Sequence, residues 1–314
     1  MKVLITGIAG FAGSHLAELA LREGADVVGT VLPGASTENL AHLEKKLATL
    51  ACDLTEAGAA TAVLRTTRPD RVFHLAGASV VGTSWALRAD VLRTNLEATY
   101  QLCEALRQHP VPCLVVSSAE IYGHVPESEQ PIRESRPAAP LSPYALSKAS
   151  QELYVGYYAR CEALPLVVVR AFNHVGPRQG LGFVWSDVAR QIVEIERGRI
   201  PPILEVGTTS TRRDFTDVRD MVRAYWLLLA KAQPGSTYNA GSGRAMAIRE
   251  VIDGFLEQAA CPIEVRRVSP RVRPLDIPLL VGDATELRTL TGWLPGISLR
   301  QSLADVLDDW RHRV

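Results

Sequence analysis

A tyrosine and a lysine four residues apart are the first side chains here whose types and spacing could do chemistry. Tyr144 and Lys148 lie in a stretch, 143–160, whose pattern predicts a helix, and Pro143 suits its first position. That spacing places both side chains on one helix face. An ammonium beside a phenol favours the phenolate and would lower the tyrosine pKa toward neutrality. Such a tyrosine can exchange a proton beside a hydride acceptor, although the same spacing alone usually marks a surface pair.

A serine-rich segment follows a short apolar run upstream of that helix. The run Leu114–Ser117 predicts a buried strand, Ser118 follows it, and Glu120 comes two residues later. Ligands of open parallel sheets bind at the carboxyl ends of the strands. A serine hydroxyl at this position can therefore hydrogen-bond a substrate oxygen. Glu120 is either a catalytic carboxylate or a cap of the local loop.

Three glycines separate the first predicted strand from the first predicted helix. Gly7, Gly10 and Gly13 stand between the strand Val3–Thr6 and the helix 11–23. Bare backbone lets a pyrophosphate approach closely, and the helix N-terminus adds N–H donors and a positive dipole end. Glycines at this spacing alone could form a plain structural turn. The strand before them and the helix after them favour a dinucleotide-binding turn.

The end of the second strand leaves the choice between NAD and NADP open. An Asp or Glu there would bind the ribose 2′-hydroxyl, and an Arg would suit a 2′-phosphate. This strand ends through Thr30 and Leu32 with neither type of residue, and Asp26 lies at its wrong end. Asp53, after the third strand, either accepts from the adenine amino group or caps a helix that runs from Thr55 onward.

The elements that must position these groups alternate along the chain. Short β-branched runs predict strands buried on both faces of a sheet at Val3–Thr6, Val27–Val31, Val72–Leu75, Leu114–Ser117 and Leu166–Arg170. Amphipathic patterns predict helices at 11–23, 56–67, 91–108, 143–160, 184–197, 217–231, 247–259 and 299–311. This order predicts an α/β fold with a doubly wound parallel (Rossmann) sheet. We expect a nucleotide-binding domain over 1–172, joined by part of the later chain, and a smaller interleaved lobe over 173–314.

Composition excludes several classes of function. The 314 residues carry 34 Lys and Arg against 34 Asp and Glu, which argues against a nucleic-acid partner. A run of about 18 apolar residues, which a membrane span requires, does not occur. Five scattered cysteines without a C-x-x-C spacing, and seven histidines without ligand spacing, predict neither a disulfide framework nor a metal site. We therefore expect a cytoplasmic protein that needs no metal.

In chain order, these motifs resemble those of the extended short-chain dehydrogenase/reductases. His74–Gly77 and Arg170–Pro177 are similar to two further motifs of that family, and the resemblance spans essentially the whole chain. It implies NADP(H) or NAD(H) as cofactor. It also implies that Tyr144 is the acid/base, that Lys148 holds the nicotinamide ribose and that Ser118 positions a sugar. The implied cofactor-binding residues are Gly7, Gly10, Phe11, Ala12, Gly13, Thr30, Asp53, Leu54, Leu75, Ala76, Asn95, Ser117, Tyr144 and Lys148.

Family members of this length usually act on nucleotide-diphosphate sugars, by epimerisation at C4, 4,6-dehydration or reduction of a 4-keto group. Dehydratases resemble this chain at Ser118 and Glu120, where their glutamate removes the C5 proton, but Ala119 replaces their middle residue. Gly180–Val184 resembles the GDP-sugar branch. Together with later motifs, it most resembles reductases that convert GDP-4-keto-6-deoxy-D-mannose to GDP-D-rhamnose. This implies reduction at C4 by NAD(P)H, with GDP-mannose 4,6-dehydration and 4-epimerisation as alternatives.

The same resemblance implies residues that bind a GDP-sugar. Arg213 and Arg273 could clamp the diphosphate, because guanidinium groups match phosphate oxygens. Asp276 can accept from ribose hydroxyls, Asn173 can bond the sugar or a phosphate, and Val184 belongs to the segment over the nucleotide. The alternative for Arg213 is an ion pair with a neighbouring aspartate, and for Arg273 it is a solvated side chain.

The resemblance also implies a homodimer. The predicted helices 91–108 and 143–160 carry apolar residues on more than one face. In similar proteins these two helices pair with their copies in a four-helix bundle.

Overall fold

A large parallel sheet organises the molecule in the computed structural model, which describes residues 1–268 and 277–314. Its seven strands run in the order β10-β6-β5-β4-β1-β2-β3, and every neighbouring pair is parallel. The strands are β1 (Lys2–Thr6), β2 (Asp26–Val31), β3 (Ala48–Ala51), β4 (Arg71–His74), β5 (Cys113–Ser118), β6 (Leu166–Ala171) and β10 (Thr237–Ala240). The order reverses between β1 and β4, and such switch points bind ligands in sheets of this kind.

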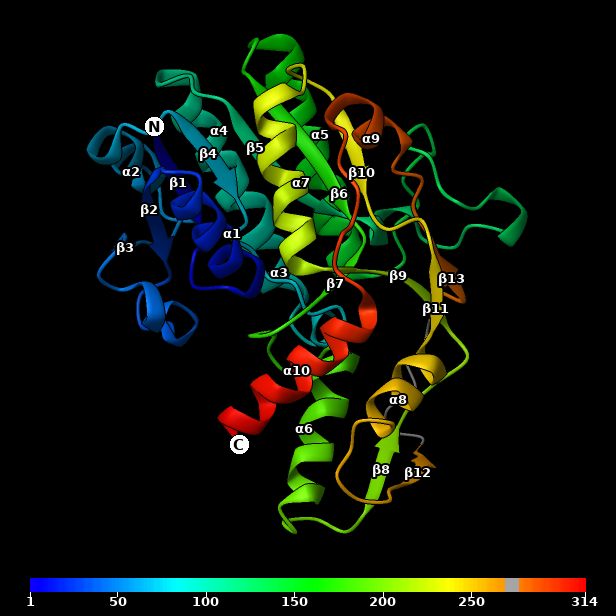
Figure 1. The fold of residues 1–314 in the computed structure, drawn as a ribbon. Coiled ribbons are helices and arrows are strands. Elements are labelled where there is room, and N and C mark those ends of the chain that lie inside the picture. Colours follow the sequence, from blue (N-terminus) through cyan, green and yellow to red (C-terminus); the bar gives the residue numbers. More distant parts are fainter. Residues whose placement is uncertain (269–276) are drawn as a thin grey trace.

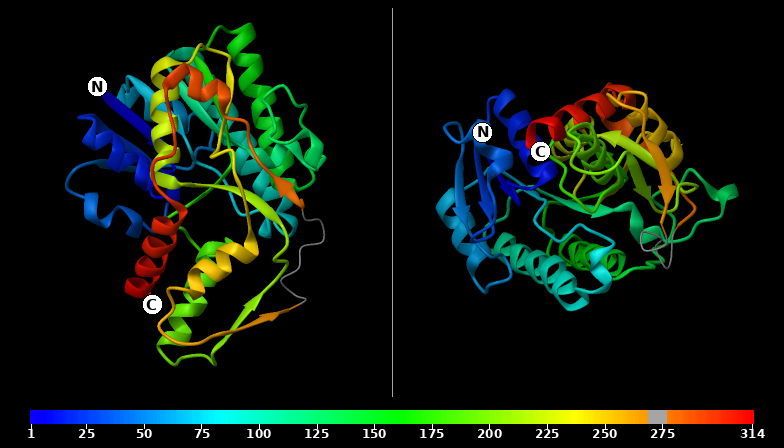
Figure 2. Two further views of the ribbon diagram at one scale, coloured as in Figure 1. Left: turned by 45° about the vertical axis from the view of Figure 1, so that its right-hand side comes forward. Right: turned by 90° about the horizontal axis from the view of Figure 1, so that it is seen from below.

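Helices cover both faces of this sheet, as the doubly wound fold requires (Figures 1 and 2). One face packs against α1 (Phe11–Arg22) and α7 (Val218–Lys231), with α9 (Thr285–Thr291) beside α7. The other face packs against α2 (Ala59–Thr67), α4 (Ala98–Gln108) and α5 (Pro143–Cys161). Strand residues alternate between these two cores: Val3 and Ile5 face α1 and α7, whereas Leu4 faces the opposite core. Burial on both faces explains why the strands read as continuous apolar runs.

A smaller part of the chain lies below the carboxyl ends of the large sheet's strands (Figure 1). It contains a four-stranded sheet of β7 (Asn173–Val175), β9 (Arg212–Asp217), β11 (Ala245–Ala247) and β13 (Leu279–Leu280). A two-stranded sheet pairs β8 (Ile203–Val206) with β12 (Glu264–Arg267). The helices α6 (Val184–Glu196), α8 (Ile248–Leu256) and α10 (Leu299–Arg313) close a separate hydrophobic core around Trp185 and Phe255.

The fold class is confirmed, and most predicted elements are present, but several details differ. The helix predicted over 91–108 is divided into α3 (Arg88–Leu92), one π-helical turn (Arg93–Glu97) and α4. The sequence pattern predicts neither the strands after β6, among them β10, nor helix α9. Both β10 and α9 return to the large sheet, where β10 adds an edge strand beside β6. Among the described residues, none of the helices combines the length and apolar character needed to cross a membrane.

Candidate active site

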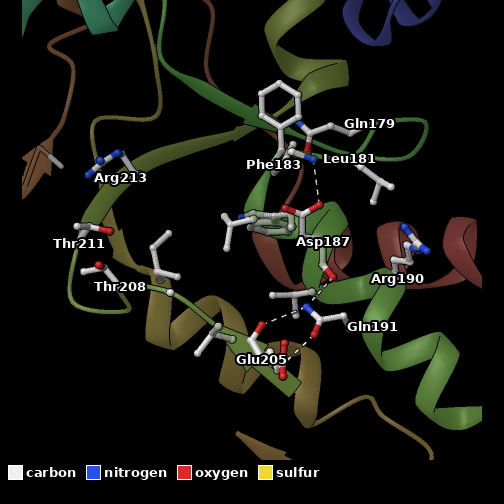
Figure 3. Close-up of a pocket in the computed structure, with 18 of the residues that line it drawn as sticks. Gln179, Leu181, Phe183, Asp187, Arg190, Gln191, Glu205, Thr208, Thr211 and Arg213 are labelled. Carbon is white, nitrogen blue, oxygen red and sulfur yellow. Dashed lines mark hydrogen bonds between the residues drawn. The ribbon is translucent and has the colours of Figure 1, made fainter. Parts of the chain in front are cut away.

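Two adjoining cavities open where the large sheet meets the smaller part of the chain. The first, of about 660 Å³, follows the carboxyl ends of β1, β2, β4 and β5. The second, of about 930 Å³, lies between α6, β8 and β9 (Figure 3). Both cavities are lined by Val81, Glu120, Asn173, His174, Gln179 and Phe183. A ligand in one cavity would therefore contact a ligand in the other at this junction.

The glycine turn has the geometry that a dinucleotide requires. Gly7 has a φ of +68°, and a Cβ added there would lie 2.9 Å from the backbone of Ala76. A Cβ added at Gly13 would lie only 2.3 Å from the carbonyl oxygen of Gly7. Helix α1 begins after Gly10 without a side-chain cap, so its first N–H groups remain available to an anion. These residues fit the pyrophosphate of a nicotinamide dinucleotide.

All the residues predicted to bind the cofactor line the first cavity except Asn95. The side chain of Asn95 is fully buried, and its contact with the cofactor stays a prediction. Its Oδ1 accepts from the backbone N–H of Ala78 at 2.8 Å, and its Nδ2 donates to the Ala78 carbonyl at 3.1 Å and to the Ser147 hydroxyl at 2.8 Å. Asn95 therefore fixes the loop after β4 to helix α5.

The adenine end of the first cavity keeps the cofactor choice open. Thr30, Val31 and Leu32 line it and carry no charge. Asp53 also lines it, and Asp53 Oδ1 accepts from the Thr55 backbone N–H at 2.9 Å and from its hydroxyl at 2.8 Å. These hydrogen bonds lower the pKa of Asp53, so the carboxylate is ionised at neutral pH. Asp53 closes a local turn and does not cap a helix, because α2 begins at Ala59 with Gly58 as its N-cap. Its place in the cavity wall is compatible with an adenine contact.

Ser118, Tyr144 and Lys148 converge on the wall of the first cavity. Ser118 ends β5, while Tyr144 and Lys148 lie on the first turns of α5. That helix begins at Pro143, and the Ser142 hydroxyl caps it by accepting from the Ala145 N–H at 3.0 Å. The Ser118 side chain is hydrogen-bonded to the Tyr144 phenol. The sequence prediction that these three groups meet is therefore matched by the geometry.

The predicted effect of Lys148 on the Tyr144 pKa was wrong. Burial raises the pKa of Tyr144 to about 12; the Ser118 hydrogen bond opposes this shift, and the charge of Glu120 adds to it. Lys148 Nζ instead donates to the Val116 carbonyl at 2.8 Å and to Gln151 Oε1 at 3.0 Å. Burial is thus the largest influence on the pKa of Tyr144. The phenol is consequently protonated at neutral pH, which is the state that a proton donor needs.

The second cavity brings together the described residues that were predicted to bind substrate. Asn173 lies at the junction, Val184 begins α6, and Arg213 comes from β9. Arg213 is 7% exposed, and its guanidinium donates to the carbonyls of Arg212 at 3.0 Å and Ile277 at 2.6 Å. These bonds hold its side chain in the cavity wall (Figure 3). Arg273 and Asp276 lie outside the described residues.

The two aspartates near Arg213 in the sequence, Asp214 and Asp217, accept hydrogen bonds from other donors. Asp214 accepts from the backbone N–H groups of Ser242 at 2.8 Å and Gly243 at 2.9 Å. Asp217 pairs with Arg219 at 2.8 Å. Both carboxylates therefore have hydrogen-bond donors of their own.

Two polar groups at the first cavity were missed by sequence reasoning. Gln179 is 4% exposed, and its Nε2 donates to the His174 carbonyl at 3.1 Å, which leaves Oε1 without a partner among the described residues. The hydroxyl of Tyr225, on α7, is fully buried and also lacks a described partner. Gln179 belongs to an irregular loop and Tyr225 to helix α7. Neither position carries a local sequence signal.

The sheet, the glycine turn and the Ser-Tyr-Lys group are the features expected of an extended short-chain dehydrogenase/reductase. A family described as GDP-mannose 4,6-dehydratase matches residues 4–306. The chain belongs to this family of the extended short-chain dehydrogenase/reductases.

Individual relatives cover the whole chain. A GDP-6-deoxy-D-mannose reductase of Pseudomonas aeruginosa is 34% identical over 315 aligned residues, covering 100% of this chain and 98% of the relative. The structure of RMD from Pseudomonas aeruginosa complexed with NADPH has a TM-score of 0.85 and 33% identity, covering 100% and 99% of the two chains. The UDP-glucose 4-epimerase of Thermus thermophilus, in complex with NAD, has a TM-score of 0.89 and 32% identity over 100% of both chains.

Proposed function

We propose that this protein reduces the C4 keto group of a GDP-4-keto-6-deoxyhexose, with NADPH or NADH as reductant, and so converts GDP-4-dehydro-6-deoxy-D-mannose to GDP-D-rhamnose. The observation that carries this proposal is the junction of the two cavities beside Ser118 and Tyr144. The 34% identity to a GDP-6-deoxy-D-mannose reductase over the full length supports it. Bound in the first cavity, the reduced nicotinamide supplies hydride to C4.

Tyr144 supplies the proton that completes this reduction. The Ser118 hydroxyl donates to the C4 oxygen, and Tyr144 transfers its phenolic proton to that oxygen as negative charge develops on it. The raised pKa keeps Tyr144 protonated at neutral pH, which suits reduction better than a reaction that begins with proton removal. The products are the C4 alcohol and the tyrosinate, which is protonated again before the next turnover.

The second cavity holds the nucleotide. Arg213 lies on the wall formed by β9, across from Asp187 and Gln191 of α6 (Figure 3). Its buried guanidinium faces the diphosphate, where exclusion of water strengthens the attraction. We propose that residues 1–172, with α7 and β10, bind the cofactor, and that most of 173–314 binds the sugar nucleotide.

The reaction can be tested directly with purified protein. We expect GDP-4-keto-6-deoxymannose to consume NADPH or NADH in equal amount, measured by the loss of reduced-nicotinamide absorbance, with a product two mass units heavier than the keto sugar. Comparison of the two cofactors also settles the preference that the uncharged β2 end leaves open. Conversion of GDP-mannose alone, with no change in absorbance, would contradict the reductase proposal and favour a dehydratase.

Dehydration is the second candidate because Glu120 lines both cavities beside Ser118. A dehydratase needs that carboxylate as the base for the C5 proton, whereas a 4-keto reductase does not. We therefore expect Glu120→Gln to retain C4 reduction within about threefold, far less than the 10²–10⁴-fold that loss of an acid/base typically costs. Steady-state NADPH oxidation measures this effect. A loss of 100-fold or more in a folded variant would support the dehydratase assignment instead.

We infer that two copies associate through α4 and α5, as the family resemblance implied. These helices expose apolar or aromatic side chains that include Tyr100, Leu153, Tyr154 and Tyr157, with Leu153 73% exposed. Exposed apolar groups gathered on adjoining helices mark association surfaces. Leu153→Arg should convert a dimer to a monomer in light scattering. The matched variant Leu294→Arg, at a position 60% exposed outside α4 and α5, should leave the mass unchanged. A monomeric unmodified protein would exclude the dimer.

We also infer a reducing, cytoplasmic setting. All five cysteines are free thiols, and two of them, Cys103 and Cys113, are buried. Free thiols persist where glutathione and thioredoxin keep them reduced.

A further inference from the structure

A continuous chain of buried hydrogen bonds lies behind the catalytic lysine. Lys148 Nζ donates to Gln151 Oε1 at 3.0 Å, and Gln151 Nε2 donates to the Thr99 hydroxyl at 2.6 Å. The Thr99 hydroxyl also lies 3.1 Å from His74 Nε2, and His74 Nδ1 lies 2.8 Å from the Thr6 hydroxyl. Gln151, Thr99 and Thr6 are fully buried. The chain thus joins α5, α4, β4 and β1 beneath the cofactor cavity.

The backbone sets the direction of every bond at the Thr6 end. The N–H groups of Leu75 and Ala76 both donate to the Thr6 hydroxyl oxygen, at 3.2 Å and 3.1 Å. The Leu75 N–H is shared with the Thr6 backbone carbonyl at 3.3 Å. Among the described residues, the hydroxyl proton of Thr6 has no acceptor other than His74 Nδ1, so it is donated there. Burial and the charge of Lys148 lower the pKa of His74 to about 3, which leaves one ring proton. This proton is on Nε2, and it is donated to Thr99.

The Thr99 hydroxyl then fixes the orientation of the Gln151 amide. Its proton is donated to the Asn95 carbonyl at 2.7 Å, so its oxygen can only accept, from His74 and from Gln151. An amide rotated by 180° would place two acceptors against each other at Thr99 and two donors against each other at Lys148. Gln151 must therefore present its carbonyl to the ammonium.

The ammonium of Lys148 has three N–H groups, and two of them have fixed acceptors, the Val116 carbonyl and Gln151 Oε1. Lys148 also lines the first cavity, so the third N–H is the one available to a ligand there. We propose that Gln151 is a positioning residue that holds Lys148 with this third N–H directed at the ribose of the bound nicotinamide nucleotide. The inference rests on the proposed function only in taking a nicotinamide dinucleotide as the occupant of that cavity.

The charge of Lys148 depends on this acceptor. Burial lowers the pKa of Lys148 to about 8, and the charge of Glu152 on α5 opposes that shift. The other titratable groups near it are neutral His74 on β4 and the protonated Tyr144, itself next to Glu120. Dinucleotide affinity should fall as the pH rises through the lysine pKa, because the ammonium then loses its proton. Loss of the Gln151 carbonyl would move this fall to lower pH, and a carboxylate in its place would move it to higher pH.

The test is the pH dependence of NADPH binding, followed by nucleotide fluorescence without any sugar, for Gln151→Met and Gln151→Glu. We expect Gln151→Met to weaken binding at pH 7 by about 10-fold, the usual effect of one hydrogen bond to a charged group. The alkaline fall in affinity should shift to lower pH in Gln151→Met and to higher pH in Gln151→Glu. Gln258→Met, a half-buried glutamine bonded to Gly254 on the smaller part of the chain, is the matched control and should change neither quantity.

Opposite shifts cannot come from a loss of stability, which both substitutions share. Equal shifts in the two variants, or none, would overturn the inference. Should Gln151→Met fail to fold, Thr99→Val releases the amide to rotate and should shift the fall in affinity in the same direction as Gln151→Met. An unchanged profile in Thr99→Val would likewise contradict the inference. A protein that shows these shifts yet does not reduce the keto sugar would refute the proposed function alone.

Discussion

Replacing Tyr144 by phenylalanine is expected to lower the turnover of C4 reduction by about 10²–10⁴-fold, the usual contribution of one general acid. The substitution removes the only phenol that is hydrogen-bonded to Ser118 among the described residues, while the ring keeps its place in the core. NADPH affinity should remain within a few-fold, because Lys148 and the glycine turn are unchanged. Single-turnover NADPH oxidation, with binding measured separately by fluorescence, distinguishes loss of proton transfer from loss of cofactor.

Tyr225 provides a matched control for this experiment. It is a second fully buried phenol on the wall of the same cavity, and its hydroxyl has no hydrogen-bond partner among the described residues. Tyr225→Phe should leave turnover within about threefold and should not lower thermal stability, because an unsatisfied buried hydroxyl costs free energy. If Tyr144→Phe retained near-normal turnover, or if Tyr225→Phe lost as much, Tyr144 would not be the acid.

The strands could be predicted where the residue pattern within the strand itself indicates burial on both faces. Strands β1, β4, β5 and β6 contain short apolar runs because both of their faces are covered by helices. Strand β10, of sequence Thr-Tyr-Asn-Ala, has no such run, and its Asn239 is committed to hydrogen bonds with Tyr122 and Ile132. It joins the sheet through pairing with β6, which no pattern within those four residues encodes.

In the candidate site, too, the residues with a local sequence signal could be predicted and those that depend on distant contacts could not. A tight turn requires glycine, and one helix face requires a spacing of three or four residues. Both requirements are visible in the sequence, so the glycine turn and the Tyr144–Lys148 spacing could be recognised. Asn95 lies in the π-helical turn over Arg93–Glu97, and the sequence pattern predicts an unbroken helix there. The direction of the Tyr144 pKa shift depends on burial by elements far apart in the chain. Gln151 lies three residues beyond Lys148, yet its importance becomes visible only when Thr99 fixes its amide.

Gly13→Ala is expected to weaken NADPH binding by about 100-fold and to lower the thermal midpoint by several degrees. The added Cβ would lie 2.3 Å from the Gly7 carbonyl oxygen and 2.9 Å from that of Ile8, and neither backbone group can swing away as a side chain could. Relief of this clash must move α1 away from β1, which opens the turn that holds the pyrophosphate. Overpacking typically costs about 1–3 kcal/mol, and about 2.7 kcal/mol corresponds to the expected change in affinity.

Gly180→Ala is the control for the loss of a glycine as such. A Cβ at Gly180 meets no atom within 4 Å, and the backbone there does not need a positive φ, so binding and stability should be unchanged. Fluorescence titration with NADPH and a thermal melt, each made on both variants, separate a cofactor effect from global unfolding.

A thermal melt with saturating NADPH gives a second measure of binding, because a ligand that binds only the folded protein raises its melting midpoint. The unmodified protein and Gly180→Ala should gain the same increment from NADPH, and Gly13→Ala should gain almost none. An equal gain in all three proteins would show that α1 can separate from β1 without opening the turn, and that the third glycine is not what admits the dinucleotide.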